Sequence, residues 1–339
     1  MAEQLGWPAG RRRMPATGTT IVFDPDDLQA SLREVGINLL VTRRGRFRAC
    51  VTRVELPRVH LIGAEENLSR IAHLSLTGER ILLVFSTRPH PPQVWGGLEL
   101  GPLEFVLHWQ SERIHQRTSG ASHWGLISLA PEHFAAHGKA LTGSELVPSP
   151  LGLVLRPSRS SAARLRYLHR QACQLADTKP CFIAHREVAR ALENDVLDAL
   201  VDCLTTGVAE DHALTRRRHA DIMNQFEDVL AVHLDGPLHM SELCAIVGVP
   251  ERTLRGCCAE FLGMSPIRYI RLRRLNLVRA ALRGSDPAAT TVADIARRYG
   301  FSELGRLAAD YRTIFGETPS ATLRRGKSRT GHSISAESA

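Results

Sequence analysis

The sequence predicts an α+β fold, in which a β-rich N-terminal domain precedes an all-α C-terminal domain with two helix-turn-helix motifs. Three observations lead to this prediction. The 339 residues are enough for two domains that each bury a core. Short apolar runs separated by glycine and proline fill residues 20–155, as is typical of strands. Beyond residue 160 the apolar residues recur every three or four positions, which is the helical period.

The composition fits an ordinary globular protein, because 43% hydrophobic and 23% charged residues exclude the fibrous and strongly disordered classes. No apolar run approaches the length of a transmembrane helix, and the N-terminal residues lack the apolar region of a secretory signal. We therefore expect a cytoplasmic protein without a membrane partner. The seven cysteines are scattered and contain no C-x-x-C pair, which argues against a disulfide framework or a structural zinc site.

The N-terminal half is predicted to consist of a flexible segment, residues 1–20, and a β-rich domain, residues 21–180. The predicted strands are Ile37–Thr42, Phe47–Glu55, His60–Ile62, Ile71–Leu76, Ile81–Ser86, Leu103–Trp109, Ile114–Thr118 and Trp124–Leu129. Many short strands with glycine and proline between them are typical of a small barrel, cupin-like in kind, or of a sandwich. The pattern does not decide between the two.

Two helices are predicted next, over residues 160–176 and 184–204. The second has an apolar stripe that either docks on its own domain or pairs with a second copy of the chain. The stripe residues assigned to dimerisation are Val188, Leu192, Val196, Ala199 and Leu200. Residues 181–217 are accordingly predicted to form a helical dimerisation or linker segment, with a polar break at Asp211–Arg218 and a further helix over residues 220–233.

The first predicted helix-turn-helix covers Met240–Phe261. Gly248 suits the end of its first helix, because glycine adopts the left-handed conformation without a steric penalty, and Pro250 suits the start of the second. On that second helix one face is apolar, whereas the opposite face has Arg252 and Arg255 near its N-terminal end. This end reaches the base edges when a helix-turn-helix docks in the major groove, and arginine can bind guanine through two hydrogen bonds.

The second predicted motif, Thr291–Arg312, repeats this plan around a turn at Gly300–Phe301. Its second helix has an inner apolar stripe, and other side chains face outward. The inner residues are Leu304, Leu307, Ala308, Tyr311 and Phe315, and the outward ones are Glu303, Gly305, Arg306, Ala309 and Asp310.

A basic helix, Ser265–Arg283, connects the two motifs. Its 18 residues from Pro266 span roughly 27 Å, comparable with the roughly 34 Å between successive major-groove faces on one side of B-DNA. We assign phosphate contacts, which position a protein without reading sequence, to Arg268, Arg271, Arg273, Arg274, Arg279 and Ser302. Residues 238–329 contain 16 Lys and Arg against 8 Asp and Glu, an excess equal to the net charge of +8 of the whole chain. A concentrated basic region is typical of a polyanion-binding module, although a solvated helix surface has the same composition.

Residues 220–325 resemble the DNA-binding domain of the AraC/XylS family of transcription regulators. The most specific part is Ala296–Ser320, with a small residue, Gly-Phe, a helix with an aromatic–basic core and a final Gly-x-x-Pro. The resemblance implies seven helices, DNA recognition by the second helix of each motif, and transcriptional control. By position it assigns base contacts to Arg252, Arg255, Gly256, Glu303, Leu304, Gly305, Arg306 and Ala308. Cys258 and Leu307 replace the family's usual phenylalanines, and Gly256 has no side chain to contact a base. Leu304 and Gly305 lack polar reach, so the second motif is expected to read few bases and to serve mainly as an anchor.

The function expected from this resemblance is a sequence-specific activator of transcription that responds to a small-molecule effector through its N-terminal domain. The expected partners are promoter DNA, RNA polymerase, the effector and a second copy of the chain. Two alternatives stay open: a barrel-type enzyme with a helical appendage, and an architectural DNA-binding protein without an effector. We expect no enzyme, because the sequence contains no nucleophile elbow, P-loop or dinucleotide fingerprint, and we expect no cofactor.

For the effector pocket we consider Trp95, Trp109, Arg117 and Trp124, which are equally compatible with plain barrel core. The N-terminal half also contains His108, Glu112 and His115, which are residue types that bind metals. The His-x-His pattern followed by glutamate of metal-binding cupins is absent. We therefore predict no metal site.

Overall fold

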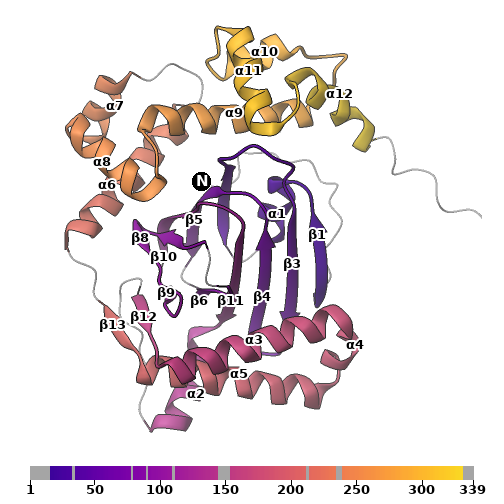
Figure 1. The fold of residues 1–339 in the computed structure, drawn as a ribbon, viewed down its shortest axis with the longest axis vertical. Coiled ribbons are helices and arrows are strands. Elements are labelled where there is room, and N and C mark those ends of the chain that lie inside the picture. Colours follow the sequence, from indigo (N-terminus) through magenta and orange to yellow (C-terminus); the bar gives the residue numbers. More distant parts are fainter. Residues whose placement is uncertain are drawn as a thin grey trace, which may run out of the picture.

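The computed structural model describes residues 16–32, 35–77, 79–88, 91–108, 111–143, 153–210, 214–233 and 239–330. Within these ranges the strands form two antiparallel sheets (Figure 1). The larger sheet has the order β1 (Gly18–Val22), β3 (Ala49–Glu55), β4 (Val59–Glu66), β11 (Ser122–Leu129), β6 (Ile81–Ser86), β9 (Phe105–His108), β12 (Leu153–Arg156) and β13 (Val208–Glu210). The smaller sheet has the order β2 (Gly36–Val41), β5 (Arg70–Thr77), β10 (Ser111–Thr118), β7 (Gln93–Trp95) and β8 (Leu98–Glu99).

The two sheets pack against each other through one apolar cluster, so the arrangement is that of a sandwich. Val51, Ile62 and Val84 contribute from the larger sheet, and Leu39 and Leu74 from the smaller one. Because successive side chains of a strand point to opposite faces, each sheet has a second face to cover. The short helix α1 (Pro25–Ser31), which the sequence pattern did not predict, adds Leu28 to the cluster between the sheets.

Helices cover the outer face of the larger sheet, below the strands in Figure 1. These are α2 (Pro131–Thr142), α3 (Arg159–Thr178), α4 (Pro180–Ile183) and α5 (Arg186–Thr206). They pack on Phe85, Phe105 and Ile127 of the sheet. Because β13 pairs with β12, residues 208–210 add a strand to the larger sheet, beyond the predicted boundary at 180, which stays a prediction.

The stripe of α5 faces its own domain, which contradicts its assignment to a dimer interface. Val196, Ala199 and Leu200 are fully buried in the cluster shared with α3 and the larger sheet, and Leu192 packs against it. Val188 is half-buried. These side chains stabilise the first domain because their burial removes apolar surface from water. Dimerisation itself stays a prediction, without a surface that supports it.

The C-terminal region consists of α6 (Leu214–Val232), α7 (Met240–Val247), α8 (Glu251–Leu262), α9 (Pro266–Gly284), α10 (Val292–Arg298), α11 (Leu304–Phe315) and α12 (Pro319–Thr330). Helix α6 begins at Leu214, inside the predicted linker 211–218. Two separate clusters form the core of this region, and α9 contributes to both: Tyr269 and Leu272 to the first, Val278 and Leu282 to the second. The expected α+β architecture is confirmed, and α9 connects the two helix-turn-helix units as one continuous helix.

We predict that Leu200→Ala lowers the free energy of unfolding by about 2–5 kcal/mol, because it leaves a cavity in a packed core. Leu141→Ala is the matched control, since Leu141 is 51% exposed on α2, and it is expected to change stability by less than about 0.5 kcal/mol. Urea unfolding measures the free energy of unfolding, and light scattering measures the mass of the protein in solution. A Leu200→Ala variant that keeps its stability but changes its mass in solution would contradict the intramolecular role of the stripe.

Candidate nucleic-acid interface

The first candidate reading helix is α8, which follows α7 across a turn at Gly248. Gly248 has a φ of 73°, the left-handed conformation expected for it. The inner face of α8 is buried through Leu254, Cys257, Cys258 and Phe261. The opposite face is exposed at Arg252, Arg255 and Gly256, and a side chain added at Gly256 would meet open space.

Arg255 forms an ion pair with Glu251 one turn earlier, with 2.7 Å between Nε and Oε1. Both side chains are about half exposed, at 52% and 51%. Exposed pairs of this kind contribute only ~0–1 kcal/mol, so the guanidinium can exchange Glu251 for another acceptor at little cost. Arg252 and Arg255 are therefore both available for contacts outside the protein.

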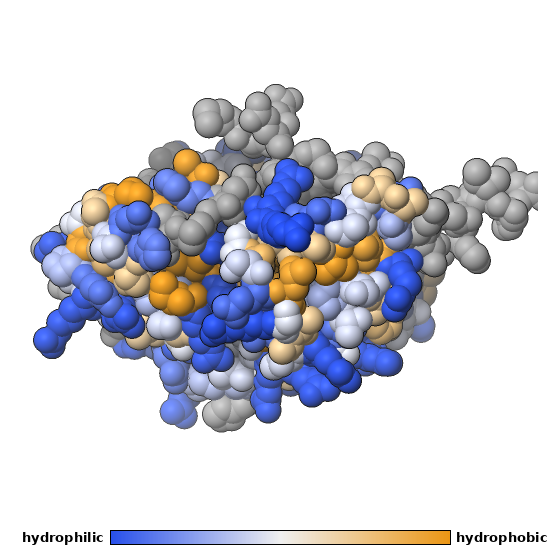
Figure 2. All heavy atoms as spheres, turned by 90° about the horizontal axis from the view of Figure 1, so that it is seen from above, coloured by the Kyte–Doolittle hydropathy of each residue, from blue (hydrophilic) through white to orange (hydrophobic). Residues whose placement is uncertain are grey.

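The second candidate reading helix, α11, has an exposed N-terminal end. Ser302, Glu303, Gly305 and Arg306 are exposed, and Ala308 is half-buried. The expected inner stripe holds for Leu307 and Tyr311, but it is wrong for Leu304, which is 39% exposed because α11 begins there. Figure 2 views the C-terminal helices from above, where strongly hydrophilic side chains separate the hydrophobic areas.

The arginines of α9 divide into exposed and engaged ones. Arg268 is exposed, and Arg274 is half-buried, which lowers its pKa. Arg271 binds Asp310 of α11. Arg273 and Arg279 are only 14% and 16% exposed and bind carboxylates of the protein. In this conformation Arg273 and Arg279 are bound within the protein, and their assignment to phosphate contacts stays a prediction.

Arg273 is engaged because it binds a buried carboxylate, that of Glu227. Glu227 of α6 is 3% exposed and accepts a hydrogen bond from Tyr269 Oη at 2.5 Å and one from His115 Nε2 of β10 at 2.9 Å. Arg273 binds its other oxygen. Burial alone would raise the pKa of Glu227, but the hydrogen bond from His115 and the charge of Arg273 hold that pKa at about 2. The carboxylate thus stays ionised and joins α6, α9 and the smaller sheet.

The outer face of the smaller sheet forms the rest of this contact between domains. On β10, alternate residues point to the helices: Arg113 binds Asp228 of α6, and Arg117 lies against Gly263 directly after α8. The ring of His115 lies edge-on to Phe261 of α8, with 6.3 Å between centroids. The C-terminal half of α8 is therefore fixed against the first domain, while its N-terminal half with the two arginines is not.

A second contact joins α1 to α9. Asp24, the N-cap of α1, accepts a hydrogen bond from Arg279 Nη2 at 2.6 Å and also binds Arg283. Arg283 reaches Asp26 as well, at 3.0 Å. Burial alone would raise the pKa of Asp24, and the charges of Arg279 and Arg283 overcome this and lower it. These ion pairs therefore occupy Arg279 and Arg283 of α9, the helix that connects the two helix-turn-helix units.

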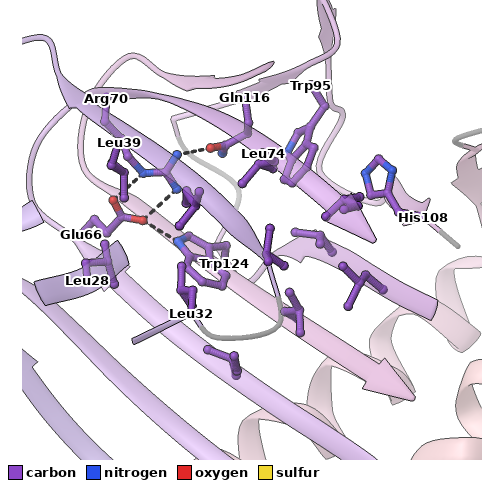
Figure 3. Close-up of a pocket in the computed structure, with 17 residues that line it drawn as sticks. Leu28, Leu32, Leu39, Glu66, Arg70, Leu74, Trp95, His108, Gln116 and Trp124 are labelled. Atoms are coloured by element: carbon purple, nitrogen blue, oxygen red, sulfur yellow. Dashed lines mark hydrogen bonds and ion pairs between the residues drawn. The ribbon is translucent and has the colours of Figure 1, made fainter. Parts of the chain in front are cut away.

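A cavity lies between the two sheets and is closed on one side by α1 (Figure 3). Trp95 and Trp124 line it, as considered from the sequence. Arg117 does not, because it is on the helix-facing side of β10, and Trp109 lies outside the described residues. Sequence reasoning missed Leu28 of α1, Leu32 directly after α1, and the ion pair of Glu66 with Arg70, which also line the cavity.

The candidate metal ligands do not converge. His108 Nδ1 is bound to Glu112, whereas His115 points away from the cavity and binds Glu227. Among the described residues no group of three His, Cys, Asp or Glu side chains is arranged to hold a metal ion. A search of the same residues for a helix both long enough and apolar enough to cross a bilayer finds none.

The domain contact is expected to weaken in acid because of His73 on β5. Burial lowers the pKa of His73 to about 4, and of its neighbours Glu227 raises it while His115, Arg273 and Arg113 lower it. The unfolded chain has a histidine pKa near 6.5, so the unfolded state binds the proton first. The contribution of His73 is fully present above about pH 6.5 and is lost as the pH falls towards 4.

We predict that the free energy of unfolding falls between about pH 6.5 and 4, and that His73→Asn removes up to roughly 3 kcal/mol of this fall. His169, on the buried face of α3, has a pKa lowered by burial to about 4 and contributes in the same direction. Equilibrium unfolding at several pH values checks this, and an unaltered slope in His73→Asn contradicts it.

The chain was compared with protein families and with known proteins. A family model described as a helix-turn-helix domain matches residues 243–325. The chain is 33% identical over 144 residues to a probable thc operon regulatory protein of Rhodococcus erythropolis, covering 40% of this chain and 43% of that protein. It is 39% identical over 92 residues to the XylDLEGF operon transcriptional activator of Pseudomonas putida, covering 26% of this chain and 28% of that protein. The chain thus spans less than half of the length of these curated relatives.

Among solved structures, a probable AraC family transcriptional regulator from Rhodopseudomonas palustris is 34% identical and covers 31% of this chain and 97% of its own, with a TM-score of 0.29. The family match covers the helices that present Arg252 and Arg306. We conclude that residues 243–325 of this chain are an AraC-type helix-turn-helix domain.

Proposed function

We propose that this protein is a sequence-specific DNA-binding regulator of transcription whose N-terminal domain responds to a small-molecule effector. The observation that carries the proposal is the division of α8: its C-terminal half is fixed in the protein, while Arg252 and Arg255 are exposed at its N-terminal end. In a helix-turn-helix that end enters the major groove. The XylDLEGF relative is named a transcriptional activator, which favours activation. We propose RNA polymerase as a further partner and the cytoplasm as the location.

The contacts between domains supply a route from effector to DNA. Leu28 of α1 and its C-cap Leu32 line the cavity, while Asp24 and Asp26 at the start of α1 bind arginines of α9. A ligand that fits the cavity in only one position of α1 shifts the population towards that position. Displacement of α1 frees Arg279 and Arg283 for phosphate groups. The effector would thereby change affinity for DNA without touching the reading helices.

We predict that Arg252→Ala and Arg255→Ala each cost about 1–3 kcal/mol of binding to the preferred site and relax the preference at one base pair. Arg190→Ala, an exposed position on α5, is the matched control and should bind as the unaltered protein does. Selection of bound sequences from a random DNA pool, followed by gel shifts at several salt concentrations, measures both effects. Unchanged preferences in both variants would show that α8 does not read bases.

The same gel shifts separate the competing functions. Binding to the selected site that weakens steeply with salt supports the regulator, because released counterions accompany phosphate contacts. Binding of equal strength to all sequences supports an architectural protein. Absence of DNA binding would refute the proposal and return the enzyme alternative to first place.

We also predict that Asp24→Asn raises the affinity for all DNA sequences several-fold and steepens the salt dependence by about one unit for each arginine released. Asp177→Asn removes the same charge from an exposed position on α3 and controls for the change in net charge. If the two variants bind DNA equally, the ion pairs between α1 and α9 do not compete with phosphate groups.

A further inference from the structure

We infer that the cavity between the sheets binds an uncharged, mostly apolar molecule that carries one hydrogen-bond donor, a hydroxyl or N–H group, directed at Nε2 of His108. The inference names the chemical class of effector and therefore rests on the proposed function. Three features of the cavity carry it: an apolar lining, a charge pair that is already complete, and one buried polar atom without a partner.

The lining is apolar over most of its surface. Side chains from both sheets and α1 enclose about 690 Å³ of space outside the protein atoms, including the open mouth. Leu32, Leu39, Leu74, Leu82, Val84 and Leu126 are representative. Pockets that bury small molecules are mostly apolar, with a few polar groups that fix orientation. The lining therefore selects a hydrophobic body.

The charges in the cavity are matched within the protein. Arg70 and Glu66 are 4% and 2% exposed and form two hydrogen bonds, Nε to Oε2 at 2.6 Å and Nη2 to Oε1 at 2.9 Å. Arg70 Nη1 also binds Gln116, and Trp124 Nε1 donates to Glu66 at 2.6 Å (Figure 3). A carboxylate ligand would have to displace Glu66 and leave a buried charge unpaired, which is strongly unfavourable. The ligand is therefore neutral.

The unsatisfied atom is Nε2 of His108, at the end of β9. His108 is 2% exposed, lines the cavity and packs beside Trp95, with 5.5 Å between ring centroids. Its Nδ1 lies 2.5 Å from Glu112, and within the part of the chain that the structure describes Nε2 has no partner. The carboxylate of Glu112 can only accept a hydrogen bond, so Nδ1 is the donor, and an imidazole with its single proton on Nδ1 has an acceptor at Nε2. A buried acceptor without a donor is costly, and a ligand donor removes that cost.

Three probes of one shape test the inference by calorimetry on the full chain without DNA: 4-propylphenol, propylbenzene and 4-propylbenzoate. We expect 4-propylphenol to bind about tenfold more tightly than the other two, as one buried hydrogen bond implies. In His108→Leu the affinity for 4-propylphenol should fall to that for propylbenzene. The affinity for propylbenzene should be the same as in the unaltered protein. His185→Leu, at an exposed position, should leave all three affinities unchanged.

Glu112→Gln provides a second variant, since it leaves the cavity lining intact and removes the carboxylate that fixes the tautomer of His108. It should narrow the preference for the phenol without abolishing binding of propylbenzene. Tighter binding of the benzoate, an unchanged phenol preference in His108→Leu, or no binding of any probe to the unaltered chain would overturn the inference. Since DNA is absent, these results are independent of the regulator function. A phenol that binds but leaves DNA affinity unchanged would instead count against the effector role.

Discussion

The arrangement of the two domains depends on one buried carboxylate. Glu227 is surrounded by Tyr269, Arg273 and His115, which come from α9 and from the outer face of the smaller sheet. A buried charge is stable only when its hydrogen-bonding capacity is met by partners in fixed positions. The three partners therefore fix α6 and α9 relative to the sheet, and α8 follows because it shares a core with both helices.

Helix α9 transmits this constraint to the far end of the molecule. Its first half belongs to the core around α6–α8 and its second half to the core around α10–α12. A helix packed at both ends behaves as a rod, so the two reading helices keep their relation to each other. The arginines of this rod can bind either carboxylates of the first domain or phosphate groups of DNA. Competition between these two acceptors is the physical basis of the proposed control.

The cavity lies where it can influence that competition. Strand β10 has Gln116 in the cavity and His115 against α6, and α1 has Leu28 in the cavity and Asp24 on α9. Alternation along a strand and the two sides of a short helix thus connect one internal volume to the surface of the DNA-binding domain. A change in the position of either element alters contacts on both sides at once, because packed interiors respond as units.

What the sequence by itself determined was local. The two reading helices, the glycine turn at Gly248 and the exposed arginines Arg252 and Arg255 follow from side chains three or four residues apart, whose spacing fixes one face against a core. Most strands were predictable for the same reason, because alternation and turn residues act over a few positions.

The tertiary structure decided everything that depends on distant partners. Arg279 is separated from Asp24 by 255 residues, and His115 from Glu227 by 112, so no periodicity relates them. For the same reason the stripe of α5 could not be assigned to core or dimer from its spacing. Helix α1 gave no signal, and His108 was considered only as a metal ligand. The helical period shows which residues share a face of a helix. What that face contacts depends on residues far away in the sequence and is seen only in the folded structure.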